Sequence, residues 1–172
     1  VGNGQLIARV AINTNLAAAA GGVTAMGLIW ALTKKADLSM AMNGALAGLV
    51  AVTAPCAYID PWAAIVIGSV GGVLVILGTE LLDKLKIDDP VGAVPVHGLN
   101  GIWGTVAIGL FGKSSLGVAN DGLFYGGGLT QLGIQLVGVL AVAGFVFVGM
   151  GIIFKLIDRT IGLRVPQEEE FR

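Results

Sequence analysis

Long uncharged stretches divide this chain into five apolar segments, and short connectors that carry charged residues separate them. A helix needs roughly 20 apolar residues to cross the hydrocarbon core of a bilayer, and segments of this length meet that need. The pattern predicts five transmembrane helices at about 8–33, 38–55, 62–84, 90–112 and 130–160, followed by the start of a tail at 161–172. We therefore expect an all-α fold, a polytopic transmembrane helix bundle in which residues 1–172 form a single membrane domain.

The start of the fourth segment has a clear local signal. Asp89-Pro90 predicts a helix N-terminus, because Asp is a favoured N-cap and Pro is tolerated at the first helical position. Pro95 lies one turn further on and has no N–H to donate to the carbonyl of Val91. At membrane depth that carbonyl needs another partner, and a polar cavity could supply one.

Composition supports a membrane protein and excludes other classes. Hydrophobic residues make up 55% of the chain and charged residues 12%, with a mean hydropathy of +0.87, whereas roughly 25% charged residues are usual in soluble domains. The net charge of −1 leaves no basic face for nucleic acid. A single cysteine, Cys56, excludes an intrachain disulfide and a cysteine-cluster metal site. The lipid bilayer is therefore the expected surrounding, with no nucleic-acid partner.

Basic residues are distributed unevenly between the two sets of connectors. Only two lie on the side of the N-terminus, Arg9 and Lys113. Eight follow the first, third and fifth segments: Lys34, Lys35, Lys84, Lys86, Lys155, Arg159, Arg164 and Arg172. Because cytoplasmic loops are enriched in Lys and Arg, we expect a multi-pass protein of the plasma membrane with a cytoplasmic C-terminus. The chain lacks an initial Met and ends within a charged stretch, so we also expect a fragment of a longer protein.

The only histidine, His97, lies inside the uncharged fourth segment. An ionisable side chain is costly in lipid, which favours a position on a cavity or pathway, although a packed and hydrogen-bonded structural histidine remains an alternative. Ala93, Gly101 and Gly104 continue its helix face, and such small residues suit either close helix packing or a narrow lumen. Metal ligation is not favoured, because no Cys or carboxylate stands at ligand spacing. No serine shares the span, so nothing supports a hydrolytic site.

Four stretches resemble one known family when they are taken together. The segment 88–104 with Gly109-Leu110-Phe111 resembles the second histidine-bearing helix of the ammonium transporter family (Amt/Mep, distantly related to Rh proteins). The segment 43–58 is similar to the eighth span of that family, and 113–117 to the loop after the histidine helix. Residues 162–166 and 168–170 resemble the start of its cytoplasmic tail.

The resemblance implies a fold and a function. The family has eleven spans in two five-helix halves of inverted topology plus a last helix, and this chain resembles spans seven to eleven, the second half of this inverted-repeat ammonium-channel fold. It implies transport of ammonium or ammonia (NH4+/NH3) by a homotrimer, with no enzymatic activity and no cofactor. The missing N-terminal half would carry the partner histidine of the pore.

Particular residues take roles from the resemblance. His97 would be one of two pore histidines that share a proton and line a narrow hydrophobic channel. Leu46 and Ala93 would belong to the apolar pore wall, and Thr53 would place a hydroxyl near the extracellular end of its helix. Asp89 resembles a structural aspartate near the pore.

The tail and the overall role leave alternatives open. Arg164, Pro166 and Glu168 lie just inside the membrane and could contact a cytosolic regulator, in this family a PII-type signal protein, or they could form an ordinary solvated end. The chain could also belong to an ammonium sensor of the same fold, or be a half-transporter scaffold that conducts nothing.

Overall fold

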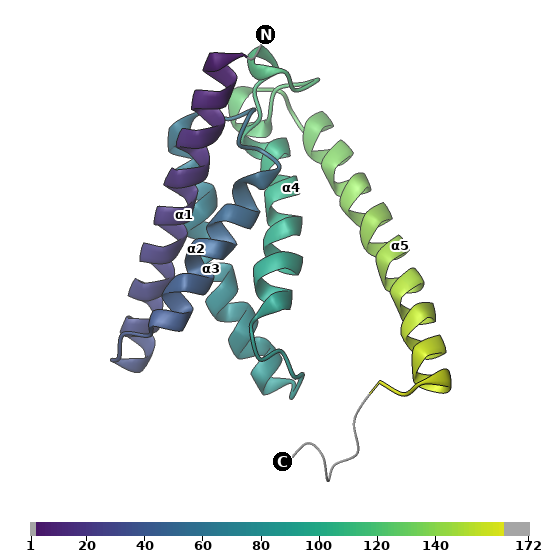
Figure 1. Cartoon of the computed structure of the whole chain (residues 1–172). Helices are drawn as coiled ribbons and strands as arrows, with labels where there is room; N and C mark the ends of the chain where they lie inside the picture. The colour runs from purple at the N-terminus through teal and green to yellow at the C-terminus, as the bar shows by residue number, and fades with distance from the viewer. Residues whose placement is uncertain (1–2, 164–172) are drawn as a thin grey trace. The chain divides into compact units, whose positions relative to one another are not determined.

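The computed structural model describes residues 3–163, and these contain helices, turns and loops but no strand (Figure 1). The predicted all-α fold is confirmed. Its α-helices are α1 (Gly4–Thr33), α2 (Leu38–Thr53), α3 (Pro61–Lys84), α4 (Asn100–Phe111) and α5 (Thr130–Thr160). A π-helical stretch at Val94–Leu99, called the π segment below, leads directly into α4, and short 3-10 helices lie at Ser114–Leu116 and Leu123–Tyr125.

Four helical stretches within residues 3–163 are long and apolar enough to cross a membrane: Gly4–Thr33, Pro61–Lys84, Val94–Phe111 and Thr130–Thr160. Helix α2 is also apolar but has only 16 residues. At a rise of 1.5 Å per residue it is shorter than the hydrocarbon core is thick.

The predicted start of the fourth helix at Pro90 is wrong. The N–H of Gly92 donates to the carbonyl of Asp89 at 3.1 Å, which closes a turn over residues 89–92. Pro90 has the fixed φ that suits the second position of such a turn, and Gly92 has a φ of +70° that favours glycine. The helical conformation therefore begins at Ala93, three residues later than the Asp-Pro signal indicated.

The chain divides into two compact units, Val1–Leu136 and Val137–Arg172. The second contains most of α5, whose apolar side chains are largely exposed, and this helix ends where the N–H of Gly162 donates to the carbonyl of Ile157 at 3.1 Å. That the two units form one membrane domain with five spans stays a prediction.

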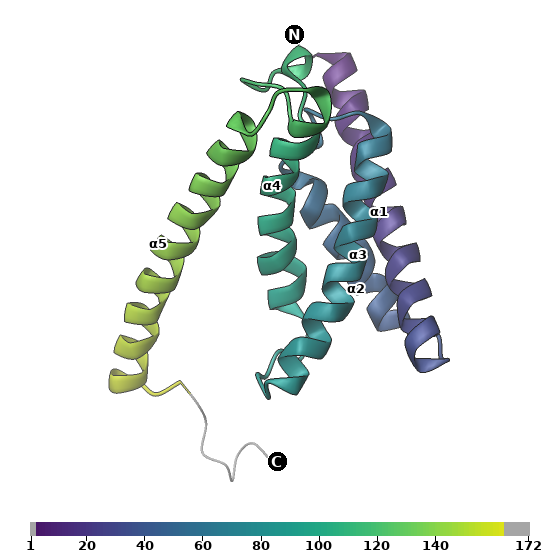
Figure 2. The same cartoon turned by 180° about the vertical axis from the view of Figure 1, so that it is seen from behind.

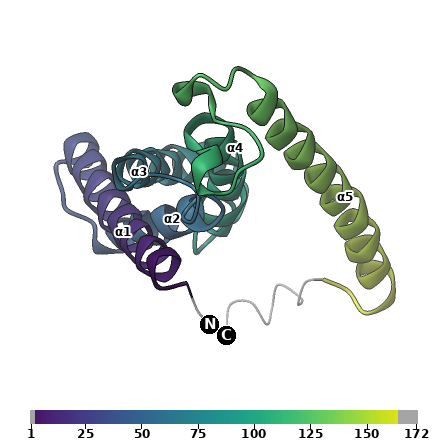
Figure 3. The same cartoon turned by 90° about the horizontal axis from the view of Figure 1, so that it is seen from above.

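In the first unit the helices α1, α2, α3 and α4 alternate in direction (Figures 1 and 2). Helix α2 packs against the other three, as the view from above also shows (Figure 3). Glycines allow the close approach: a Cβ on Gly48 would collide with the carbonyl of Ala17. Buried residues form two clusters, one with Ala17, Ala51, Val52, Ile59, Ala63, Ala64, Ile67, Ala107 and Phe111, and one with Ala25, Ala47, Val75, Ile76 and Val96.

The turn between α2 and α3 is held by a buried amide. Asn13 of α1 is fully buried, and its Nδ2 donates to the carbonyl oxygens of Cys56 at 2.8 Å and Ile59 at 3.0 Å. A buried carbonyl without a donor is costly, so this side chain stabilises the turn by donating to two of its backbone carbonyls.

Charged residues lie at both ends of the first unit. The C-terminal ends of α1 and α3 lie at the same end (Figures 1 and 2). Lys34 and Lys35 follow α1, Lys84 ends α3, and Lys86 follows it. Arg9 contacts the carbonyl of Ala57 at the opposite end, at 3.5 Å. This separation agrees with the alternating connectors of the sequence, but the side of the membrane on which each end lies stays a prediction.

Candidate functional site

A carboxylate caps the helical stretch that carries the histidine. The two oxygens of Asp89 accept the backbone N–H groups of Ala93 at 2.8 Å and Val94 at 2.9 Å. These N–H groups have no partner within the first turn of a helix, and a negative charge at this end is stabilised by the helix dipole. Asp89 therefore fixes where the π segment begins, although it acts across the turn at Pro90 instead of from the adjacent position.

Pro95 has no N–H to donate to the carbonyl of Val91, but that carbonyl has another hydrogen-bond donor within the described residues. Asn43 of α2 donates its side-chain Nδ2 to the oxygen of Val91 at 3.4 Å. The same nitrogen would lie 3.2 Å from a Cβ on Gly92, which shows how closely α2 packs there. A neutral amide from another helix thus offers this carbonyl a hydrogen bond in place of the one that Pro95 cannot make.

His97 lies within the π segment, and its side chain is exposed in the described chain. Ala93 precedes it by about one turn and is exposed as well. Among residues 3–163, no side chain makes a hydrogen bond to the imidazole. The backbone of the π segment fixes the position and direction of the Cα–Cβ bond of His97, and such wide turns are frequent at functional sites.

Leu46 and Thr53 both lie on the exposed side of α2. They are seven residues apart, so they share one helix face, while Gly44, Ala47, Gly48, Ala51 and Val52 are buried. The hydroxyl of Thr53 donates to the carbonyl of Leu49 at 2.7 Å, which leaves its oxygen able to accept another hydrogen bond.

The structure places the four predicted pathway residues at exposed positions: Leu46 and Thr53 on α2, His97 in the π segment, and Ala93 immediately before it; α2 and the π segment pack together. It shows no hydrogen bond among them within the described residues. Asn43 of α2 bonds instead to the carbonyl of Val91, in the turn that precedes the π segment. Arg164, Pro166 and Glu168, the predicted regulatory tail residues, lie outside the described residues.

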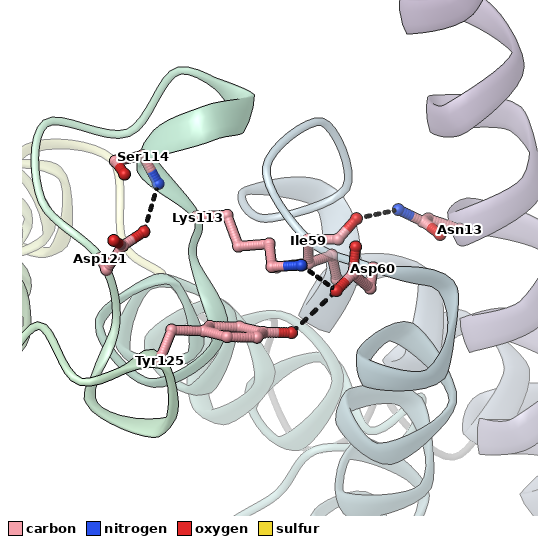
Figure 4. A network of polar contacts seen from close by, with 7 residues as sticks. All are labelled: Asn13, Ile59, Asp60, Lys113, Ser114, Asp121 and Tyr125. Atoms are coloured by element: carbon pink, nitrogen blue, oxygen red, sulfur yellow. Dashed lines mark hydrogen bonds and ion pairs between the residues drawn. The ribbon is translucent and has the colours of Figure 1, made fainter.

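A polar network that the sequence did not suggest lies at the other end of α4 (Figure 4). The Nζ of Lys113 donates to Oδ2 of Asp60 at 2.6 Å, and the hydroxyl of Tyr125 donates to the same oxygen at 2.9 Å. The ammonium group also lies 4.6 Å from the centre of the Tyr125 ring, in a cation–π contact. Nearby, Asp121 accepts the backbone N–H of Ser114 at 2.7 Å. We call Asp60, Lys113 and Tyr125 the loop network.

Each group of the loop network changes the proton affinity of its neighbours. The hydrogen bond from Lys113 lowers the pKa of Asp60, against a smaller opposing effect of burial. The same contact raises the pKa of Lys113, and burial followed by the bond to Asp60 raises the pKa of Tyr125. The hydrogen bond from Ser114 lowers the pKa of Asp121.

One signal in the sequence could have indicated this pairing. Asp60 immediately precedes α3 and Lys113 follows α4 closely, and consecutive antiparallel helices bring such positions to the same end. Within residues 3–163 there is no group of three or more His, Cys, Asp or Glu side chains that could hold a metal ion. The predicted site residues thus offer one imidazole, one hydroxyl, a capping carboxylate and exposed apolar side chains.

Comparisons with known proteins agree on one family. The model of the Ammonium Transporter Family matches residues 2–172. Among curated relatives, the chain is 45% identical over 168 residues to "Ammonium transporter Amt2" of Archaeoglobus fulgidus, covering 94% of this chain and 36% of that protein. It is 43% identical over 163 residues to "Putative ammonium transporter sll1017" of Synechocystis, covering 94% of this chain and 34% of that protein.

Solved structures show the same likeness. The protein titled "Sensor Amt Protein" aligns with a TM-score of 0.86 and 39% identity, over 96% of this chain and 40% of that one. Mep2 of Candida albicans aligns with a TM-score of 0.89 and 32% identity, over 98% of this chain and 38% of that one. The chain thus spans between 34% and 40% of the length of these four relatives.

Proposed function

Because the chain belongs to the ammonium transporter family, we propose that it forms part of a protein that moves ammonium or ammonia across a membrane. Members of this family are transporters, not enzymes. The chain would act together with a further half of the transporter, which would supply the second histidine of a twin-histidine pair and close the pore. The whole transporter would form a homotrimer in the plasma membrane, with its C-terminus in the cytoplasm.

The observation that supports a pathway best is the exposed imidazole of His97. It is the only histidine, it lies in a stretch long and apolar enough to cross a membrane, and its side chain has no hydrogen-bond partner among the described residues. A buried structural histidine would be expected to have such a partner, because unpaired buried polar groups are costly. An exposed imidazole in this setting suits a second histidine or a passing substrate.

The residue types suit neutral ammonia better than a bare ion. Moving NH4+ intact through an apolar lumen carries a heavy desolvation cost. Removing the proton at the entrance, passing neutral NH3 and relaying or returning the proton lowers this cost. An imidazole pair can accept a hydrogen bond from ammonia and pass a proton between its nitrogens.

The other predicted residues have supporting roles in this proposal. Leu46 and Ala93 form apolar wall and exclude water, and Thr53 offers an oxygen to the substrate near the outer end. Asp89 maintains the start of the helical stretch below His97, as its two hydrogen bonds to the backbone support. The tail residues Arg164, Pro166 and Glu168 would contact a PII-type protein, which deletion of residues 162–172 followed by a PII pull-down would test; undiminished binding would exclude them.

A sensor of ammonium is the second candidate, because the structural neighbour "Sensor Amt Protein" matches 96% of this chain. A kinase or cyclase domain after residue 172 in the whole protein would favour sensing. A scaffold that conducts nothing is a third candidate. Both would contain the same helices, so only transport measurements separate conduction from the alternatives.

The experiment that tests the proposal is uptake of labelled methylammonium by cells that express the whole transporter with His97→Ala. We expect uptake to fall strongly or its preference for ammonium over methylammonium to change. Asn15→Ala is the matched control, because it also removes an exposed polar side chain from a span but one that bonds only to its own helix, at the carbonyl of Ala11. Unchanged uptake and preference in His97→Ala would remove His97 from the mechanism.

A further inference from the structure

The amide of Asn100 is fully buried where the π segment joins α4. Its Nδ2 donates to the carbonyl of Pro95 at 2.9 Å and lies 3.4 Å from the carbonyl of Gly71 on α3. One side chain therefore links the backbone of the π segment to a neighbouring helix.

Asn100 contacts the backbone on both sides of His97. Its side-chain amide donates to the carbonyl of Pro95, two residues before the histidine. Its backbone N–H donates to the carbonyl of His97. A π turn is wider than an α turn, and the return to α geometry disturbs the regular pairing of N–H and C=O groups. A carbonyl left unpaired at membrane depth would favour a different turn, so the amide stabilises this one.

The π segment and Asn100 pack against a face of α3 on which glycines leave room for their close approach. A Cβ on Gly78 would lie 2.8 Å from Cδ1 of Leu99 and 3.0 Å from Cβ of Pro95, and one on Gly71 would lie 2.8 Å from Oδ1 of Asn100. Gly71 and Gly78 are seven residues apart and share a helix face. These contacts leave the π segment little freedom to move toward α3.

We infer that Asn100 is a positioning residue for His97, holding the π segment in the conformation that presents the imidazole to the pathway. The inference rests on the proposed role of His97 as a pathway residue. Asn100 touches no substrate itself; it acts through the backbone carbonyls of Pro95 and His97. Replacing it should therefore change where the ring points without removing any group from the pathway wall.

A matched control exists in the same unit. Asn13 is also an asparagine with 0% exposure, and it too donates to two backbone carbonyls, but these belong to the turn between α2 and α3. Asn13→Leu and Asn100→Leu thus each remove a buried amide donor, the first from the turn between α2 and α3 and the second from the junction of the π segment with α4. Only the second place is next to His97.

The test uses the whole transporter, reconstituted in liposomes, with its histidines labelled with 15N. The imidazole signal of His97 is assigned by its disappearance in His97→Ala. In Asn100→Leu we expect this signal to move and ammonium transport per folded molecule to fall by about tenfold to a hundredfold, as displacements near 1 Å do elsewhere. In Asn13→Leu the signal and the rate per folded molecule should stay as in the wild type. If Asn100→Leu does not fold, Asn100→Ser retains one donor and should shift the signal in the same direction by less.

The possible results separate this inference from the proposed function. An unmoved signal in the Asn100 variants, or an equal shift in Asn13→Leu, would overturn the positioning role. Normal transport by His97→Ala would overturn the proposed function, whereas a shift confined to the Asn100 variants would still support the positioning role.

Discussion

The two ends of the helical stretch 93–111 are held in different ways. At and just before the π segment, neutral amides from Asn43 and Asn100 donate to the backbone carbonyls of Val91 and Pro95, and the carboxylate of Asp89 accepts two backbone N–H groups. Past the other end, the loop network uses the charges of Asp60 and Lys113, which are about a third exposed. Charges are costly to bury, whereas amides need only a hydrogen-bond partner. The fully buried contact at the π segment is accordingly that of the neutral amide of Asn100, while the charged groups at both ends stay partly exposed.

The largest effect should come from removing a buried amide. Asn100→Leu removes the side-chain donor to the Pro95 carbonyl, and Asn13→Leu removes the donor to the carbonyls of Cys56 and Ile59, so we expect each to lower the free energy of unfolding by about 2 to 3 kcal/mol. Because no ion is involved, the loss should be the same at low and high salt. Thermal unfolding of the purified transporter at two ionic strengths measures it, and a strongly salt-dependent loss would contradict the role of neutral amides.

The cap at Asp89 should give the next largest effect. Asp89→Ala leaves the N–H groups of Ala93 and Val94 without acceptors and should cost about 1 kcal/mol. Asp89→Asn retains an oxygen acceptor and should cost less. Thermal unfolding of both variants measures the difference. If the two substitutions were equally destabilising, the negative charge and not the acceptor would be the important property.

The loop network should respond more weakly, and to salt. Asp60→Asn retains the shape and the acceptor for Tyr125 but removes the ion pair with Lys113. Partly exposed ion pairs contribute little to stability and are screened by salt. We therefore expect a smaller loss than for the buried amides, one that disappears at high salt. A loss that is as large at high salt would show that the pair behaves as a buried one.

A change of pH between 5 and 9 should have the smallest effect on the stability that the loop network contributes. The pKa of Asp60 lies below its ordinary value of 3.8, so its contribution is present above that pH and is lost as the pH falls through the lowered value. The pKa of Lys113 lies above its ordinary value of 10.5, so its contribution is present below that pH and is lost as the pH rises through the raised value. Unfolding temperatures of wild type and Asp60→Asn should differ by a constant amount from pH 5 to pH 9. A difference that changed near neutral pH would exclude this account.

The sequence predicts the helices of this fold better than the polar contacts between them. Continuous apolar runs bounded by Lys34 and Asp60-Pro61 indicate helix limits directly, because charges are rare within spans and Asp-Pro favours a helix start. Asn13 and Asn100 give no such signal, since a buried amide in an apolar run is distinguished only by the carbonyls that packing brings to it. The pairing of Asp60 with Lys113 joins residues far apart in sequence and needs the antiparallel arrangement to be known first.

The fourth helix shows why a correct local rule can give a wrong boundary. Asp89 does cap the helix and Pro90 does begin an ordered turn, but Gly92 inserts a positive φ between them and Ala93. Likewise, Pro95 did indicate an unpaired carbonyl at Val91, yet its partner, Asn43, comes from another helix. Local patterns identify which groups need partners, and packing decides which partners they find.

The proposed pathway role of His97 is tested most directly by ammonium flux through the purified whole transporter in liposomes. Wild type and His97→Ala are compared for ammonium and potassium under the same gradients, with Asn15→Ala as the control. We expect His97→Ala to lose ammonium flux or to admit potassium, while the control behaves as the wild type. Ammonium flux and exclusion of potassium that are both unchanged in His97→Ala would contradict the account.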